Sequence, residues 1–345
     1  MTVKLWMRGE VRVTERRAPI TPADAASLVR EGFAVTVEES AQRVHPIEDY
    51  AAAGCTVAEA GSWVDAPQDA VVVGLKELPE DPPLLRHRHV LFGHAYKKQE
   101  GAERLLRRFD AGGGVLLDLE YLTDDSGRRL AAFGYWAGYV GAALAVLHHR
   151  GTLDAPLRPT SVPELDAALA GGDPLTAVVV GALGRCGQGA DRALTAAGVT
   201  PTRWDLAETR DLDRAALLRH EVMVNAVLTS KPVPPFLRPS DLDEPGRVLR
   251  TVCDVTCDVG SPFNVLPIYD RTTTWDRPAR ALRDEPPLDL IAIDNLPSLV
   301  PLEATDAFST DLLPLLRDLP RATSPWQRAE RLFHDTVASI KEASL

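Results

Sequence analysis

The sequence predicts an α/β fold with two domains, each built on a doubly wound, mostly parallel sheet. Short apolar segments alternate with helical stretches along the chain, as in sheets whose parallel strands are joined by helices. A chain of 345 residues exceeds one ordinary hydrophobic core and favours two domains. A glycine-rich stretch at 181–190 follows an apolar run at 176–180 and leads into a helical stretch, as in nucleotide-binding sheets. We therefore expect two Rossmann-like domains around a cleft.

The expected strands are short and apolar, and most are rich in β-branched residues. Before the glycine-rich stretch they lie at 4–7, 34–38, 70–75, 90–93 and 114–118, and after it at 223–227, 250–255 and 288–293. Helices are expected at 22–31, 103–109 and 133–147. Segments rich in proline are expected to be loops, at 151–174 and 277–287. The loop between the strands at 70–75 and 90–93 is expected to expose His87 and His89.

The glycine-rich stretch has the composition of a phosphate cradle. Gly184 and Gly187 keep two positions of the G-x-G-x-x-G pattern, while Ala182 takes the first and Gly181 stands one place earlier. Glycines let the backbone approach a pyrophosphate, and a helix N-terminus offers N–H donors to it. Asp205 follows at about the twenty-residue distance of a carboxylate that binds a ribose hydroxyl. The predicted cofactor-binding residues are Gly181, Leu183, Gly184, Arg185, Gly187, Asp205 and Thr209.

The segment 202–205, after the glycine-rich stretch, is expected to be a strand that ends in Asp205. This acid favours NAD as the cofactor. The carboxylate of Asp205 would repel the 2′-phosphate of NADP. Arg203 and Arg210 are close enough in sequence to leave NADP open as an alternative.

Polar side chains follow three successive strands in the first part of the chain. Lys76 and Glu77 come after the first of these strands, His94 and Lys97 after the second, and Glu120 after the third. Parallel strands deliver their carboxyl ends to one edge of a sheet, where open α/β sheets bind ligands. Each of these charges alone would be read as a solvated loop residue, but their repeated position favours acid–base or anion-binding chemistry.

Composition limits the class of partner. A net charge of −11 argues against nucleic acid and anionic membranes, which require a basic face. No apolar run approaches the length of a membrane span, and the start of the chain has no signal-peptide core. The 4 cysteines, with no histidine pair beside them, indicate neither a disulfide framework nor a metal site. We expect a cytoplasmic enzyme, a monomer or small homo-oligomer, that acts on small molecules.

Nine ordered segments carry a resemblance to a known family. They lie at 15–22, 61–63, 74–77, 94–97, 118–120, 127–134, 181–190, 230–232 and 294–299. In these segments the chain resembles the NAD-dependent, lysine-forming saccharopine dehydrogenases, in the superfamily that includes alanine dehydrogenase. The resemblance runs from Leu5 to about Phe333, nearly the whole length. We expect a substrate domain at 1–132 with 298–345 and an NAD-binding domain at 133–297.

The resemblance implies a reversible reaction in which saccharopine, NAD+ and water give L-lysine, 2-oxoglutarate and NADH, in lysine synthesis or breakdown. Lys76 and His94 match the family's acid–base groups. The matching substrate-binding residues are Arg17, Glu77, Lys97, Glu120, Arg128, Arg129 and Asp294. Of these, the cationic groups would bind substrate carboxylates, and Glu77 and Glu120 would receive the lysine amine. A structural ion pair between Glu120 and one of the two adjacent arginines is the alternative for that glutamate.

Two departures from the family pattern keep other functions open. Asn295 stands where the family has a histidine, and Lys98 where an acid is expected. A related opine-type reductase that joins 2-oxoglutarate to a different primary amine is therefore the second hypothesis. The third is a non-catalytic, dinucleotide-binding regulator, against which the presence of both Lys76 and His94 counts.

Overall fold

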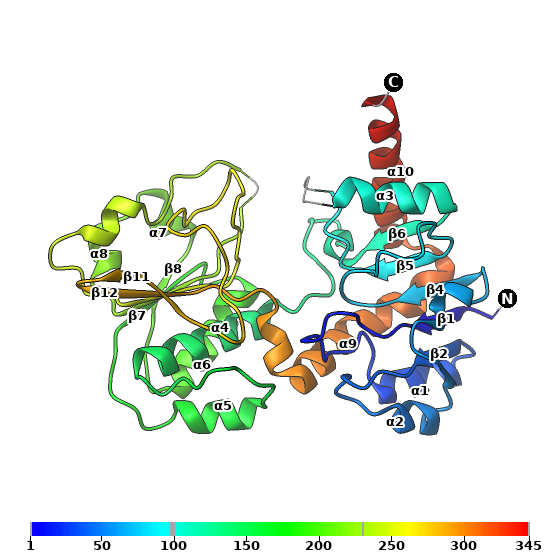
Figure 1. Ribbon diagram of the computed structural model, residues 1–345, viewed down its shortest axis with the longest axis horizontal. Coiled ribbons are helices and arrows are strands. Elements are labelled where there is room, and N and C mark those ends of the chain that lie inside the picture. The colour runs from blue at the N-terminus through cyan, green and yellow to red at the C-terminus, as the bar shows by residue number, and fades with distance from the viewer. Residues whose placement is uncertain (1, 97–100, 230, 344–345) are drawn as a thin grey trace. The chain divides into compact units, whose positions relative to one another are not determined.

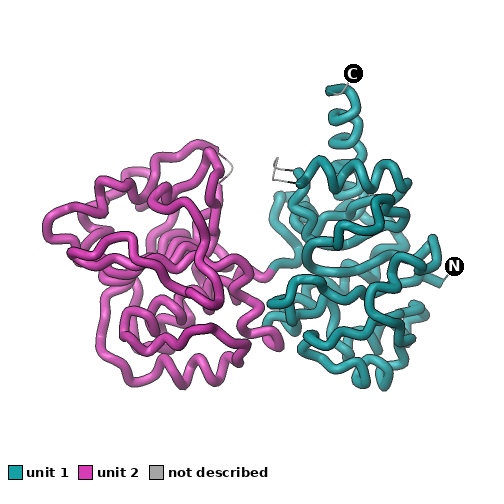
Figure 2. Tube along the Cα trace, viewed as in Figure 1, with its two compact units in different colours: residues 1–132, 304–345 teal, residues 133–303 magenta. Residues whose placement is uncertain are grey.

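A computed structural model describes residues 2–96, 101–229 and 231–343. The chain divides into two compact units, the first made of residues 1–132 with 304–345 and the second of residues 133–303 (Figure 2). The sequence-based division at 132 and 297 differs from this one only at the second position. Lys97, expected to bind substrate, lies outside the described residues, as does Ser230 of the family segment 230–232.

The first unit is built on a six-stranded parallel sheet with the order β3-β2-β1-β4-β5-β6 (Figure 1). Its strands are β1 (Lys4–Met7), β2 (Ala34–Glu38), β3 (Thr56–Ala58), β4 (Ala70–Val73), β5 (Arg88–Leu91) and β6 (Val115–Asp118). Its helices are α1 (Pro22–Arg30), α2 (Ile47–Ala52), α3 (Ala102–Gly112), most of α9 (Pro301–Asp318) and α10 (Ser324–Ala343). Short 3-10 turns are η1 (Ser62–Asp65), η2 (Leu119–Tyr121) and η5 (Leu319–Arg321).

The second unit also has a six-stranded sheet, with the order β11-β12-β10-β9-β7-β8. Its strands are β7 (Ala177–Val180), β8 (Thr202–Trp204), β9 (Val222–Asn225), β10 (Thr251–Asp254), β11 (Arg280–Asp284) and β12 (Pro287–Ile291). All pairs are parallel except the hairpin of β11 and β12. Its helices are α4 (Gly134–His149), α5 (Val162–Leu169), α6 (Arg185–Ala196), α7 (Leu206–Arg210) and α8 (Arg214–Leu218), with 3-10 turns η3 (Pro239–Asp243) and η4 (Leu296–Leu299). The predicted α/β class with two mostly parallel sheets is confirmed.

Alternate residues of β7 enter two different cores, which explains its uninterrupted apolar sequence. Val179 belongs to the core shared with α4 and α6, whereas Val178 and Val180 belong to the core on the other face with Leu217 of α8. A strand covered by helices on both faces has no solvent side and needs no polar alternation. The sheet of the second unit is therefore doubly wound.

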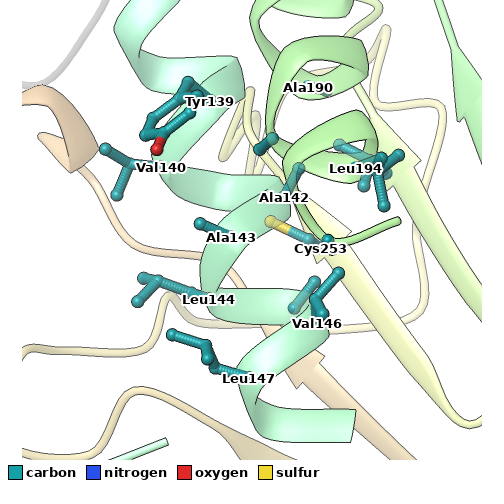
Figure 3. Close-up of a cluster of buried hydrophobic side chains, with 14 of the residues drawn as sticks. Tyr139, Val140, Ala142, Ala143, Leu144, Val146, Leu147, Ala190, Leu194 and Cys253 are labelled. Atoms are coloured by element: carbon teal, nitrogen blue, oxygen red, sulfur yellow. The ribbon is translucent and has the colours of Figure 1, made fainter. Parts of the chain in front are cut away.

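Helices α4 and α6 touch through glycines. A Cβ atom built on Gly138 of α4 would lie 1.7 Å from the carbonyl oxygen of Cys186, and one on Gly189 of α6 would lie 1.8 Å from that of Tyr135. Figure 3 shows the continuation of this interface, where Ala142 lies beside Ala190 and Leu194. Only glycine permits this backbone approach, which holds the helix that follows the glycine-rich turn.

Three sequence-based expectations about loops are wrong. The segment 151–174 holds α5, because Ser161 and Glu164 form a capping box that starts a helix within it. Strand β5 begins at Arg88, so His87 and His89 are not exposed: their side chains are 4% and 0% accessible. The His89 ring packs beside Trp63 and Phe109, aromatic neighbours far away in sequence, and the His87 ring packs against His89. The segment 277–287 holds β11, which tolerates Pro286 because that residue lies in the turn between the paired positions Asp284 and Pro287.

Candidate active site

The carboxyl ends of β4, β5 and β6 lie side by side and bring three sequence-predicted residues to one edge of the first sheet. Val73 pairs with Val90, and Leu91 pairs with Asp118, so the loops after these strands start at matching levels. The pairing continues beyond the strands, because the Phe92 N–H donates to the Leu75 carbonyl at 3.1 Å. Lys76, His94 and Glu120 follow at this edge, as the sequence predicted.

His94 faces a largely buried carboxylate. Its Nδ1 lies 3.4 Å from one oxygen of Glu120, whose other oxygen lies 3.7 Å from a guanidinium nitrogen of Arg129. The imidazole is 51% exposed and the glutamate side chain only 9%. His94 has a φ of 48°, a left-handed conformation that costs about 1–3 kcal/mol in a non-glycine residue. A backbone held in this way fixes where the imidazole lies.

Asp118 supports this pair and was not predicted to do so. It ends β6 and caps η2, where its Oδ1 accepts a hydrogen bond from the Glu120 N–H at 2.9 Å. Only 1% of Asp118 is exposed. Burial raises its pKa to about 6, and the nearby Glu120 carboxylate adds to the rise, while backbone N–H groups and His94 oppose it. The signals in the sequence were its position at the end of an apolar strand and its place in the family segment 118–120.

The backbone of Lys76 is held from the loop after β1. Glu10 accepts from the N–H groups of Leu75 at 2.7 Å and Lys76 at 3.0 Å, and buried Arg8 donates to the Lys76 carbonyl. Arg8 and Glu10 also form an ion pair at 3.3 Å with side chains only 0% and 4% exposed. A Cβ on Gly74 would lie 2.5 Å from Nε of Arg8, so only glycine fits there. No pattern in the sequence predicted this support, because it comes from the loop after β1, more than sixty residues away.

Two predicted substrate-binding residues are paired with side chains of their own unit. Glu77 forms an ion pair with Arg12. Partial burial raises the pKa of the Glu77 carboxyl, but the hydrogen bond from Arg12, together with other contacts, outweighs burial, and the pKa is lowered overall. Arg17 donates from Nε and Nη2 to the two oxygens of Glu15 at 2.8 and 2.5 Å, and both residues are buried. Such forked pairs are the strongest of the charge-assisted hydrogen bonds.

The two adjacent arginines point to different surroundings. Arg129 forms the ion pair with Glu120 that the sequence left open as an alternative role for that glutamate. Arg128 is exposed and closes a turn in which Oδ1 of Asp124 accepts from its backbone N–H at 2.9 Å. Arg129 therefore belongs with the His94 cluster, and Arg128 stands at the surface of the unit.

In the second unit, the glycine turn between β7 and α6 leaves no room for a Cβ at Gly181 or Gly187. Gly181 has a φ of 86°, and a Cβ on Gly187 would lie 2.2 Å from its carbonyl oxygen. Gly184 is the N-cap of α6, and Arg185 is the first residue of that helix. The turn thus presents backbone N–H groups at a helix N-terminus, the arrangement that binds phosphate.

Asp205 joins this turn to the end of β8. One carboxylate oxygen accepts from the Leu183 N–H and the other from the Leu206 N–H, both at 2.9 Å. Leu183 and Leu206 are 72% and 68% exposed, which places an apolar side chain on either side of the acid. Thr209 donates its hydroxyl to the Asp205 carbonyl at 2.9 Å. Asp205 therefore lies beside the glycine turn, as the dinucleotide pattern requires.

A second buried acid of this unit was missed. Asp254, at the end of β10, accepts hydrogen bonds from Asn225 at 3.0 Å, from the Thr256 hydroxyl at 2.7 Å and from the Tyr269 hydroxyl at 2.7 Å. This network fixes the loops after β9 and β10. Asp294 is exposed and follows β12.

Relatives match nearly the whole chain. A saccharopine dehydrogenase (NAD+, L-lysine-forming) of Neurospora crassa is 42% identical over 365 residues, covering 99% of this chain and 98% of the relative. A relative of the same name from Emericella nidulans is 40% identical over 371 residues, covering 99% of both chains. The chain belongs to the saccharopine dehydrogenase family. The resemblance found in the sequence is confirmed.

The saccharopine dehydrogenase family shares its architecture with alanine dehydrogenases. The family described as alanine dehydrogenase/PNT, N-terminal domain, matches residues 6–140. An L-alanine dehydrogenase structure superposes with a TM-score of 0.69 over 96% of this chain and 94% of that one, at 16% identity. At that identity the likeness concerns the fold alone, and it confirms that the two sheets are Rossmann-like.

Within 2–96, 101–229 and 231–343, no helix has both the length and the apolar composition of a membrane span. In the same part of the chain, no three histidine, cysteine or acidic side chains are grouped as metal ligands.

Proposed function

We propose that this protein is an NAD-dependent oxidoreductase acting on a secondary amine, and that it interconverts saccharopine with L-lysine and 2-oxoglutarate. Oxidation of the C–N bond gives an imine, which water attacks to form a carbinolamine that splits into the amine and the keto acid. The observation that carries the proposal is the convergence of Lys76, His94 and Glu120 at one sheet edge in a chain 42% identical to a named saccharopine dehydrogenase over nearly its full length.

The NAD site is proposed at the glycine turn of the second unit, in residues 133–303. A Cβ at Gly181 or Gly187 would clash with neighbouring atoms, so the backbone of this turn is bare. A bare backbone at a helix N-terminus is suited to bind a pyrophosphate through its N–H groups. Asp205 would accept from the ribose hydroxyls, with Leu183 and Leu206 beside it offering apolar surface to the adenine. When bound, NAD+ would act as the hydride acceptor.

The preference for NAD over NADP has support in the arrangement of charges. A 2′-phosphate would meet the Asp205 carboxylate. Of the two arginines that left NADP open, Arg203 and Arg210, the first donates to Asp191 at 2.6 Å. Arg185 at the start of α6 would contact the cofactor, and Asp294 after β12 would lie toward the substrate.

His94 and Lys76 are the proposed acid–base groups. Protons must move at the amine nitrogen, at the attacking water and at the carbinolamine, and each transfer needs a positioned group. With Nδ1 of His94 facing the Glu120 carboxylate, Nε2 is the atom that takes and returns the proton, and Glu120 stabilises the imidazolium. Lys76 is the second acid–base group. Hydrogen bonds to Glu10 and Arg8 fix its backbone, and so the point from which its side chain extends.

The first unit, residues 1–132 with 304–345, is the proposed substrate domain. Arg128, Arg129, Arg17 and Lys97 are proposed to receive the substrate carboxylates, and Glu77 and Glu120 the lysine amine. Exposed Arg128 is open to solvent for this role. For Arg17 and Glu77 the role requires sharing with Glu15 and Arg12, to which they are bonded.

The pairing of Glu77 favours a second candidate function. Glu77 is one of the two acids that would bind the lysine amine, and its negative charge is already paired with Arg12. The site therefore attracts the second amino group of lysine less strongly. An opine-type reductase that joins 2-oxoglutarate to another primary amine would use the same cofactor site and acid–base groups.

The test is oxidation of NADH by the purified full chain with 2-oxoglutarate and a panel of amines that includes L-lysine, L-ornithine, L-alanine and L-glutamate. Turnover with L-lysine and NADH, far above that with NADPH or with pyruvate in place of 2-oxoglutarate, supports the main proposal. A different preferred amine supports the opine-type reductase. Protein that binds NADH and turns over none of the amines contradicts both.

The cytoplasm is the proposed location. None of the four cysteines, which all lie in the described part of the chain, forms a disulfide, as is common in proteins of a reducing compartment. A fluorescent fusion found in an oxidising compartment would contradict this. Analytical ultracentrifugation of the full chain tests the expected monomer or small homo-oligomer.

A further inference from the structure

Asp118 touches both segments that carry the proposed acid–base pair of the first unit. It is the last residue of β6, and its Cα lies opposite Leu91 at the end of β5. Its Oδ1 accepts from the N–H of Glu120, two residues further along its own chain segment. Its Oδ2 faces the other segment, because a Cβ on Gly93 would lie only 3.2 Å from it. Gly93 directly precedes His94, so one carboxylate lies between the two backbone positions.

The close approach of the loop after β5 to β6 depends on Gly93 and on the backbone conformation of His94. A Cβ on Gly93 would also lie 2.7 Å from Cδ2 of Leu116, so a larger residue would require the Leu116 side chain to move. His94 adopts its left-handed backbone directly after this glycine. The loop after β5 is thereby pressed against β6, and the imidazole reaches within 3.4 Å of Glu120.

The charged and titratable groups around Asp118 are few. Glu120 and His94 lie on its two sides, Arg129 faces it through Glu120, and Tyr96 and Tyr121 stack edge to face at 5.1 Å. The Tyr96 hydroxyl is buried and has no hydrogen-bond partner among the described residues. Among the described residues no cation pairs directly with Asp118, and a negative charge there acts on Glu120 and His94.

We propose that Asp118 is a positioning residue of the acid–base site: its carboxylate holds the Glu120 turn against His94, and its ionised form adds the negative charge that keeps this pair in its working state. The inference rests on the proposed function, because it assigns Asp118 a task in the same proton transfers. Burial raises the pKa of Asp118 to about 6, so the carboxyl changes charge within the range in which histidine titrates.

The charge change gives the proposal a definite sign. Above pH 6, wild-type Asp118 is ionised, whereas an amide at this position is always neutral. Below pH 6 the wild-type carboxyl becomes neutral too, and the two proteins become alike in charge. The ratio of wild-type kcat to Asp118→Asn kcat is therefore large in alkaline solution and falls toward one in acid. A role in folding alone gives a ratio that does not change with pH.

The experiment compares four full-length proteins: wild type, Asp118→Asn, Asp118→Ala and the control Asp69→Asn. The amide keeps an oxygen for the Glu120 N–H, and alanine removes both the charge and the acceptor. Asp69 precedes β4 at the opposite edge of the same sheet and pairs with Lys4 at 2.8 Å, so its variant makes the same charge change far from His94. Thermal unfolding and the Kd for NADH show whether each variant is folded.

We expect Asp118→Ala to lower kcat about tenfold or more with little change in KM, as for removal of a group that orients an acid–base residue. Asp118→Asn loses about tenfold at pH near 8 and about twofold or less at pH near 5. Asp69→Asn matches wild type. A pH-independent ratio for Asp118→Asn, or wild-type kcat at every pH, overturns the proposal. If Asp118→Ala does not fold, the amide variant decides.

A second measurement separates this inference from the proposed function. If wild-type protein shows no turnover, the function fails, but the His94 ring signals in an NMR titration still report on Asp118. An inflection near pH 6 that is present in wild type and absent in Asp118→Asn supports the positioning role. Identical His94 titration curves in both proteins overturn it.

Discussion

One carboxylate oxygen of Asp205 accepts a hydrogen bond from the backbone N–H of Leu183 at 2.9 Å. The acid expected to bind the ribose thus also holds the glycine turn expected to bind the pyrophosphate. Two parts of the cofactor site, about twenty residues apart in the dinucleotide pattern, are coupled through one side chain. Substitutions at Asp205 are therefore expected to change cofactor affinity and cofactor choice together.

Asp205→Asn keeps an oxygen for the Leu183 N–H but removes the charge that repels a 2′-phosphate. We expect the Kd for NADH to rise about tenfold, equivalent to about 1.4 kcal/mol, and the ratio of NADPH to NADH affinity to increase. Fluorescence titration with both cofactors measures this. Asp243→Asn, which removes an exposed partner of Arg283, is the control and should bind NADH as wild type. Unchanged cofactor affinities in Asp205→Asn would show that this acid does not face the ribose.

His94→Gln and Lys76→Met remove the two proposed acid–base groups. Each is expected to lower kcat by about 10²-fold or more, since positioned proton transfer contributes about 10²–10⁴. The Kd for NADH should stay within about twofold, because the cofactor cradle belongs to the other unit. Steady-state kinetics and NADH titration provide the two readouts.

The control for the histidine is His334→Gln on the exposed side of α10, which should keep wild-type kcat. If both active-site variants kept more than half of the wild-type kcat, the acid–base assignment would be wrong.

Gly189→Ala tests the contact of α4 with α6. Its new Cβ would fall 1.8 Å from the Tyr135 carbonyl oxygen, so the helices must separate. We expect a loss of about 2–3 kcal/mol in the free energy of unfolding of this unit, as for severe overpacking. Gly184→Ala is the matched comparison, because its Cβ would meet only the Gly181 carbonyl at 3.5 Å. Equal thermal stability of the two variants would refute the close contact.

His89 predicts how stability depends on pH. Its side chain is 0% exposed, neither ring nitrogen has a partner among the described residues, and burial lowers its pKa well below the usual value. The folded state keeps the ring neutral while the unfolded chain binds a proton below about pH 6.5, so stability falls as the pH drops through that value.

His89→Leu removes this titration. Relative to wild type, its free energy of unfolding should improve by about 2 kcal/mol between pH 8 and pH 5, at up to about 1.4 kcal/mol per pH unit. Urea unfolding at several pH values measures the difference. The exposed His334→Leu serves as control, and a parallel pH dependence in wild type and His89→Leu would contradict the prediction.

Local patterns in the sequence predicted most strands of both sheets, but not β3 or β11, and the positions that follow the strands. Unbroken apolar runs predicted β4 and β7, and the repeated polar ends of β4, β5 and β6 predicted the shared edge. The buried support was hidden: Glu10 and Arg8 reach Lys76 from the loop after β1, and nothing in their own surroundings in the sequence reveals that partner. Proline composition suggested a loop where the β11 hairpin forms, because a turn and a loop have the same residues.

The central claim is the cleavage of saccharopine, and the most direct test is to incubate the full chain with saccharopine and NAD+ and to identify every product. L-lysine, 2-oxoglutarate and NADH should appear in equal amounts in wild type and fall together in His94→Gln. Protein that binds NADH but releases neither L-lysine nor 2-oxoglutarate from saccharopine would contradict the proposed function.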